Sequence, residues 1–397
     1  MLHALTVQSA RALLSPSARL LIAAAIPGGV PTITGTDWRD VHWPTLLALA
    51  AYERAESQVD SLLRKAPGGA VPDEVLQSLR ARLRVAQFRS AELAESAADV
   101  GHALDATGVE GLWLKGAALA FRSPHGFAVR AMGDMDVLVS SEAHAGLRDR
   151  LYASGWRDAP AADGYDRHHH GVPLRRGGAT LELHGEIFPP GHPFAASDAG
   201  AWLSRAETIT HPGGRSLVLP VEWHLVHSAV HWAWSHEGAV GSWQFLHDAA
   251  LLTEGWASDG PEWASVVRHA TALGAHAPAG WALWASAQLT GSTVPDAVIA
   301  ALRGSARQFD GVAERAWTLR AFHSPMASPS VRWSRLWWRY AMRGLGSRDR
   351  AWPWRLGRLT SRDDRAESGP TERIGLSRAL GTRLQRWRRH LVRVLDS

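Results

Sequence analysis

Three carboxylates in the middle of the chain have the types and spacing needed to bind a metal ion beside a phosphate. Asp134 and Asp136 open an otherwise apolar stretch, and alternate residues of a β-strand point to the same side. Two carboxylates held this close repel each other unless a cation lies between them, and their hard oxygens favour Mg²⁺ or Mn²⁺ over zinc. We therefore expect both aspartates to hold metal at a solvent-facing cleft.

The third carboxylate lies on another short apolar stretch. Glu182 shares a strand face with His184, and it completes a two-metal site if the two strands are neighbours. Lys115-Gly116 forms a turn before a predicted helix, where backbone N–H groups can bind an anion. Lys115 is also one of only two lysines in a chain whose other basic residues are arginines. Together these features indicate chemistry at a phosphate.

An Asp-x-Asp pair alone leaves the function open. Such a pair can simply cap a strand, and it also binds metal in enzymes that use nucleotide sugars. Three functions are therefore considered: nucleotidyl transfer from an NTP, sugar transfer from a nucleotide sugar, and nucleotide binding without catalysis. The third carboxylate, Glu182, favours nucleotidyl transfer, because it has a natural role only in completing a second metal site.

Histidines supply further candidates for a substrate pocket. His168 and His169 belong to a run of three, which is either a solvated loop or a neighbour of the acceptor or the phosphates. His184 is either a hydrogen-bonded core residue or part of the site. A zinc site is disfavoured for the run, because adjacent residues alternate in direction and the chain has no thiolates.

A second group of histidines falls on one face of a predicted helix. His224, His227 and His231 have the spacing i, i+3 and i+7, and Asp248 lies on the following predicted helix. We favour a buried polar network for these residues, and a substrate-binding wall is the alternative.

The elements that position these residues alternate between strand and helix. Apolar runs at 111–114, 135–139 and 180–184 have the length of strands, and 141–154 reads as a helix. Helical patterns precede and follow this part of the chain. The sequence therefore predicts an α+β fold, with a small mixed β-sheet core flanked by N- and C-terminal helical regions.

We divide the chain into four parts on these patterns. An N-terminal helical region spans 1–110, an α/β core 111–219 and a C-terminal helical region 220–330, and 331–397 forms an Arg- and Trp-rich basic tail. The tail carries a net charge of +11 although the whole chain carries +5, so the rest of the chain is acidic. We favour a tail that packs on this acidic part, and contact with nucleic acid or an anionic membrane is the alternative.

The overall composition excludes several classes of protein. A chain of 397 residues with 46% hydrophobic and 20% charged residues is not globally disordered. The lack of cysteine excludes disulfide scaffolds, thiolate zinc sites and cysteine nucleophiles. The longest purely apolar stretch, 20–26, is far shorter than the roughly 20 residues of a membrane span. With no convincing signal-peptide cleavage site, we expect a soluble, cytoplasmic protein.

The motifs, taken together, resemble a family of uncharacterised bacterial nucleotidyltransferases, a branch of the DNA polymerase β-type superfamily. The resemblance covers roughly residues 35–300, including the helical residues His227, His231 and Asp248. Its motifs occur in this order: Leu114-Lys115-Gly116, Arg130 to Asp136, Gly155-Trp156, His168-His169 and Glu182-Leu183-His184.

The resemblance implies a metal-dependent enzyme that moves a nucleotidyl group from an NTP to a small-molecule or peptide acceptor in a biosynthetic or tailoring pathway. Asp134 and Asp136 would hold Mg²⁺ or Mn²⁺, and Glu182 would hold one metal and help to deprotonate the acceptor. The superfamily's usual Gly-Ser phosphate turn is replaced here by Lys-Gly. On this resemblance, the nucleotide and its phosphates are bound by Lys115, Gly116, Arg130 and Gly133.

Overall fold

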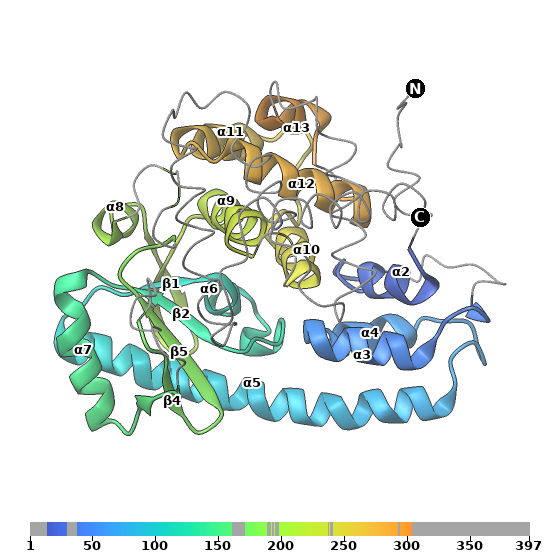
Figure 1. The fold of residues 1–397 in the computed structure, drawn as a ribbon, viewed down its shortest axis with the longest axis horizontal. Coiled ribbons are helices and arrows are strands. Elements are labelled where there is room, and N and C mark those ends of the chain that lie inside the picture. Colours follow the sequence, from blue (N-terminus) through green and yellow to red (C-terminus); the bar gives the residue numbers. More distant parts are fainter. Residues whose placement is uncertain are drawn as a thin grey trace, which may run out of the picture.

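The computed structural model places a mixed β-sheet between two groups of helices (Figure 1). The predicted roles of His168, His169 and the tail at 331–397 fall outside the described part of the chain. The structure describes residues 14–29, 38–160, 171–188, 192, 194, 198–236, 238, 241–292 and 294–303.

The strands of the described structure form one sheet of seven, in the order β3-β4-β5-β2-β1-β7-β6. The pairs β2–β5 and β1–β7 are parallel, and the other neighbouring pairs are antiparallel. The predicted α+β class with a mixed sheet between helical regions is therefore confirmed. The strands are β1 (Leu112–Leu114), β2 (Met135–Leu138), β3 (Arg157–Asp158), β4 (Leu174–Arg176), β5 (Ala179–His184), β6 (Glu207–His211) and β7 (Gly214–Val218).

Helices precede, interrupt and follow the strands. Before the sheet come α2 (Pro16–Ala23), α3 (Trp43–Glu53), α4 (Glu56–Leu63) and α5 (Asp73–Thr107). Between strands lie α6 (Lys115–Arg122), η2 (Gly126–Ala128), α7 (Ser141–Ala153) and α8 (Ala199–Leu203). After the sheet come α9 (Val221–Val230), the π-helical turn η4 (His231–Ser235), α10 (Ser242–Leu252), α11 (Pro261–Ala272), α12 (His276–Thr290) and α13 (Asp296–Arg303).

The long helix α5 connects the N-terminal helices with the sheet. It runs along the lower side of Figure 1, contacting α3 and α4 at one end and β5 and α7 at the other. A single continuous helix therefore contributes to both parts, and the proposed boundaries at 110, 219 and 330 stay predictions. No helix in the described part of the chain combines the length and the apolar character that a membrane span requires.

Alternate residues of β2 point to opposite faces of the sheet. One face is apolar, and the other carries the polar residues. Met135 and Val137 are fully buried in a cluster that includes residues of α5 and α7. Leu138 belongs to a second cluster, together with Leu114 and residues of α9. Asp136 has the same parity as Leu138 and therefore projects from the face of the sheet that looks towards α9.

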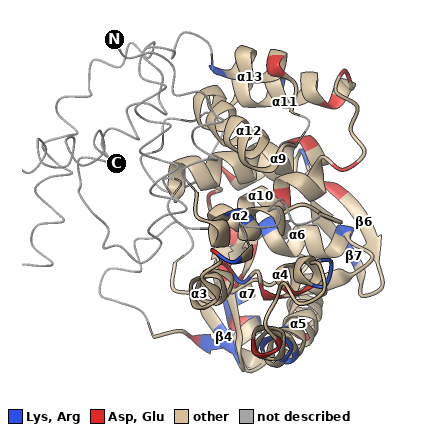
Figure 2. Cartoon of the chain, turned by 90° about the vertical axis from the view of Figure 1, so that its right-hand side faces the viewer, with Lys and Arg blue, Asp and Glu red and all other residues tan. Residues whose placement is uncertain are grey.

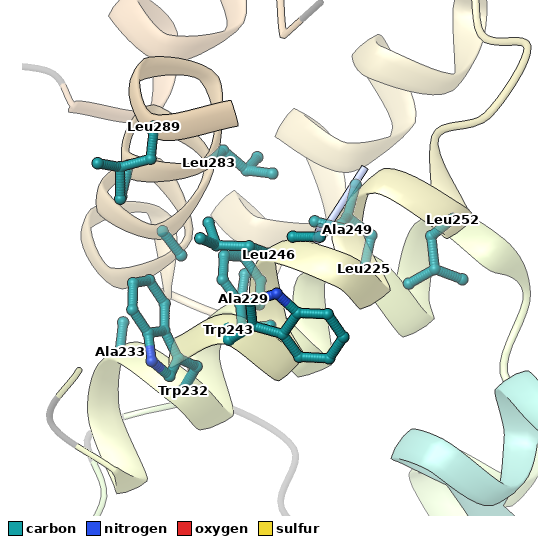
Figure 3. Packing of buried hydrophobic residues seen from close by; sticks show 14 of the residues in the cluster. Leu225, Ala229, Trp232, Ala233, Trp243, Leu246, Ala249, Leu252, Leu283 and Leu289 are labelled. Atoms are coloured by element: carbon teal, nitrogen blue, oxygen red, sulfur yellow. The ribbon is translucent and has the colours of Figure 1, made fainter. Parts of the chain in front are cut away.

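The helices after the sheet form a core that is rich in tryptophan. Trp243 packs in the cluster shown in Figure 3, and its Nε1 donates to the carbonyl of Leu21 in α2 at 2.7 Å. Trp232 stacks on Phe245 with the ring centroids 4.6 Å apart. Figure 2 shows that the ribbon of α10 and α12 is largely uncharged, as expected of helices that are buried on most sides.

A buried glutamate joins the N-terminal helices to this core. Glu53 ends α3 with 5% of its surface exposed, and its Oε2 accepts a hydrogen bond from the backbone N–H of Trp243 at 3.2 Å. The Gln244 side chain donates to the carbonyl of Glu53 at 3.3 Å. Burial raises the pKa of Glu53 to about 7, although the hydrogen bonds oppose this shift.

We expect Glu53 to make the protein less stable as the pH rises from about 4.5 to about 7. The folded protein holds this proton up to pH 7, whereas the unfolded chain releases it near pH 4.5, so stability falls with pH in that window and the loss is complete above it. The contribution is of the order of 3 kcal/mol at most. Chemical denaturation of wild type and Glu53→Gln across this range should show the wild type losing more stability. Parallel curves for the two proteins would contradict the assignment.

Candidate active site

The first element of the site is the junction between β1 and α6. Lys115 follows the last residue of β1 and has a backbone φ of 48°, in the left-handed region that side chains other than glycine rarely adopt. Its Nζ lies 2.7 Å from Oδ1 of Asp136, which belongs to the neighbouring antiparallel strand β2. The strained turn thus places an ammonium group directly on a strand carboxylate.

The second element is the parallel pair β2–β5, which brings three potential ligands together. Asp136 lies opposite Glu182 in the register of the two strands. The strands are therefore neighbours, as a metal site shared by the two residues requires. His184 Nε2 lies 2.9 Å from Oδ1 of Asp136 and 3.7 Å from Oε2 of Glu182. Ligand atoms of all three residues lie within 4.8 Å of one another.

The electrostatics of this cluster separate the roles of its two carboxylates. Burial opposes ionisation of Asp136, but the Lys115 ammonium and the hydrogen bond to His184 hold the pKa of this carboxyl well below its usual range. Partial burial and the charges of Asp136 and Asp134 raise the pKa of Glu182 to about 7. Asp136 is therefore a fixed anion, whereas Glu182 can exchange a proton near neutral pH.

The two aspartates of the Asp-x-Asp pair differ in their surroundings. Asp134 is exposed and directly precedes β2, but Asp136 is only 3% exposed, so the expectation that both face solvent is wrong for Asp136. The contacts with Lys115 and His184 account for this burial, because they replace the water that the carboxylate would otherwise need. Asp134 lies outside the group of closely spaced ligand atoms, although its charge acts on Lys115 and Glu182.

The guanidinium of Arg130 contacts Gly116, the residue that follows Lys115 in the turn. A Cβ built on Gly116 would lie 3.0 Å from Cζ of Arg130, so glycine allows this close approach. The guanidinium is buried and pairs with Asp248 of α10, with Nε 2.6 Å from Oδ1 and an NH2 group donating to Oδ2 at 2.9 Å. In this arrangement Arg130 packs against the Lys115-Gly116 turn and stabilises it. A direct contact between Arg130 and a phosphate would require the ion pair with Asp248 to open.

The same ion pair changes the interpretation of Asp248. We expected Asp248 to join the histidines of the preceding helix, but its carboxylate binds Arg130 instead. His227 is 0% exposed, and neither ring nitrogen has a hydrogen-bond partner among the described residues. Burial and the nearby Lys115 charge lower its pKa well below the usual value, and they do the same to the pKa of His231.

Arg54 is a site residue that the sequence did not reveal. It follows α3, more than 70 residues before β2, and its guanidinium lies against Gly133: a Cβ built there would be 2.7 Å from Cζ of Arg54. Its positive charge acts on the carboxylate of Asp134. No spacing or motif marks Arg54, because its contact with Gly133 joins two residues that are 79 positions apart in the chain.

Comparisons with known proteins identify one family. A model of the uncharacterised nucleotidyltransferase family matches residues 39–291. None of the curated proteins matches the sequence.

Two structures of ANT(2'')-Ia show a distant likeness to the chain. One is a solution structure of this antibiotic-resistance factor, with 12% identity over 44% of this chain and 87% of that chain and a TM-score of 0.32. The other is a crystal structure of its complex with adenylyl-2''-tobramycin, with 13% identity over 43% of this chain and 91% of that chain and a TM-score of 0.29. Scores this low do not bear on the function of this chain.

Proposed function

Because the chain belongs to the uncharacterised nucleotidyltransferase family, we propose that the cluster around Asp136 binds a divalent cation and moves a nucleotidyl group from an NTP to a small-molecule or peptide acceptor. Family membership makes the chain a nucleotidyltransferase and agrees with the resemblance read from the motifs. The metal, the acceptor and a place in a biosynthetic or tailoring pathway belong to the proposal. The observation that carries it is the grouping of Asp136, Glu182 and His184 beside the Lys115 ammonium.

The donor atoms of this cluster fit a divalent cation. An octahedral ion with ligands at about 2.1 Å separates neighbouring donors by roughly 3 Å. The distances of 2.9 and 3.7 Å from His184 Nε2 to the oxygens of Asp136 and Glu182 need little adjustment to reach this value. Mg²⁺ and Mn²⁺ both suit two carboxylates, and the imidazole nitrogen makes Mn²⁺ the better match. Asp134 is exposed at the edge of the cluster and is proposed as a ligand to a second ion.

The residues of the site have separate roles in the proposed reaction. A bound cation would neutralise phosphate charge as the acceptor oxygen bonds to the α-phosphorus and the bond to the β-phosphate oxygen breaks. Glu182 takes the proton of the acceptor hydroxyl, because its carboxylate lies opposite Asp136 in the strand register, beside the proposed cation. Lys115 binds the departing pyrophosphate, since a cation bound at Asp136 would release the ammonium from that carboxylate.

His227 and His231 support an uncharged acceptor group. The depressed pKa values of His227 and His231 keep both imidazoles neutral, so they offer hydrogen bonds without a positive charge. His227 has two ring nitrogens without partners in the described structure, and a buried polar atom is stabilised when a ligand supplies the missing hydrogen bond. These residues therefore support a hydroxyl-bearing acceptor more than a phosphate-bearing one.

Transfer of label from the α-phosphate tests this proposal. The protein is incubated with Mg²⁺ or Mn²⁺, candidate acceptors and each NTP labelled at the α-phosphate, and the products are separated and identified by mass spectrometry. Label should appear on the acceptor, with one pyrophosphate released for each transfer. Label that moves only from the sugar of a nucleotide sugar, with none from any α-labelled NTP, would contradict nucleotidyl transfer and support the sugar-transfer alternative.

A further inference from the structure

Arg54 occupies a backbone position at which glycine is the favourable residue. It caps the C-terminus of α3 with φ 56° and ψ 40°, and its N–H hydrogen-bonds back to the carbonyls of Ala50 and Ala51. Helices commonly end with a left-handed residue of this kind, and glycine adopts the conformation without the strain that a Cβ introduces. The described chain has two non-glycine residues with positive φ, Arg54 and Lys115, and both lie at the candidate site. Such strain is retained where the side chain is needed.

The side chain of Arg54 is directed towards the acidic edge of the site. Its guanidinium packs on Gly133, the residue immediately before Asp134, and no side chain at 133 intervenes. Within the described structure Arg54 is exposed and makes no side-chain hydrogen bond or ion pair, although its charge acts on Asp134. The donors of this guanidinium are therefore available to a ligand. By contrast, Arg130 is paired with Asp248, and Lys115 is paired with Asp136 unless a bound cation takes its place.

We propose that Arg54 binds the β- and γ-phosphates of the NTP and later the pyrophosphate that leaves. This inference rests on the proposed function. A guanidinium presents paired donors that match two phosphate oxygens, and it stays charged at any physiological pH. In the proposed reaction the α-phosphate binds the cation held at Asp136, where the ligand atoms converge, and the exposed residue Asp134 gives the rest of the triphosphate access to solvent on this side. Arg54 lies at that edge, and the N-terminal helices thus contribute a substrate contact to the sheet.

Arg54→Gly separates this role from a structural one. Glycine removes the phosphate contact but suits the left-handed backbone, so the melting temperature should stay the same or rise. Calorimetry with Mg²⁺ should show affinity for an NTP and for inorganic pyrophosphate falling on the order of tenfold or more. Affinity for the corresponding nucleoside monophosphate should change less than about twofold, because it lacks the β- and γ-phosphates. Arg54→Lys keeps the charge without the paired donors and should lose less affinity than Arg54→Gly.

Arg64→Ala is the matched control for this experiment. Arg64 caps the C-terminus of the next helix, α4, with an ordinary φ of −64°, and its side chain pairs with Asp60 of the same helix. Its removal should leave all three affinities unchanged. Wild-type affinity of Arg54→Gly for both NTP and pyrophosphate would overturn the inference and leave the proposed function intact. A wild-type protein that binds no NTP in the presence of metal would overturn both.

Discussion

Replacing Asp136 with asparagine should abolish nucleotidyl transfer. Asp136 is the most strongly anionic group of the site, and Glu182 and His184 lie around it. Asparagine has nearly the same shape but no charge, so it holds a divalent cation far less tightly. The lost charge stabilisation corresponds to a decrease in rate of roughly a thousandfold or more. The variant should also melt at a lower temperature, because Lys115 loses its ionised partner.

Two measurements assign this effect to metal binding. Titration of Mn²⁺ followed by electron paramagnetic resonance should show tight binding to the wild type and weak binding to Asp136→Asn. Asp149→Asn, an exposed aspartate on α7, is the matched control and should behave like the wild type in both assays. Turnover by Asp136→Asn at the wild-type rate, or wild-type turnover that persists in excess EDTA, would refute the metal-dependent reaction.

Of the single substitutions named in these predictions, Asp248→Leu should lower the free energy of unfolding the most. The change leaves the guanidinium of Arg130 buried without its carboxylate, and removing one partner of a buried ion pair typically costs about 3–5 kcal/mol. The free energy of unfolding, measured by denaturant titration, should fall by this amount. A loss below about 1 kcal/mol would show that Arg130 finds another partner or reaches water.

The double variant Arg130→Met, Asp248→Leu tests what Arg130 does. Apolar residues of similar volume often replace a buried ion pair with little change in stability, so the double variant should recover most of the loss. If Arg130 only supports the turn beneath Gly116, the double variant should bind NTP within a few-fold of the wild type. A stable double variant that had lost its affinity for NTP would instead favour the phosphate-binding role inferred from the sequence.

The sequence predicted those parts of the fold that depend on local pattern. Strand-length apolar runs correspond to β1, β2 and β5, and helical periodicity corresponds to α5, α7 and the helices from α9 to α13. The strands β3, β4, β6 and β7 were not predicted. Glu207–His211, for example, contains a single apolar residue, Ile209, and none of its residues is fully buried. Strand order was also not predictable, since it depends on contacts between residues far apart in the chain.

The candidate site was predictable where its residues share one strand or one motif. Asp136, Glu182 and His184 were identified by type and parity, and the structure places them together. Arg54 had no such signal, because it is one of 43 basic residues and an ordinary helical pattern precedes it. The pairing of Arg130 with Asp248 was equally hidden, since 118 residues separate the two. Tertiary packing determines which charged residues pair over long separations in sequence. Local sequence patterns, which describe residues a few positions apart, do not reveal such pairs.

The ion pair between Arg130 and Asp248 also has a consequence for protein synthesis. A ribosome makes all seven strands, and every residue of the acidic cluster, before it reaches Asp248. At roughly 10 residues per second, Asp248 is synthesised about 12 s after Arg130, because 118 residues separate the two. During that time burial of the Arg130 guanidinium against Gly116 would be unfavourable, because no carboxylate would balance its charge. A nascent or stalled chain therefore carries the acidic residues before Arg130 has its partner, and the proposed nucleotide site is complete only after α10 has been synthesised.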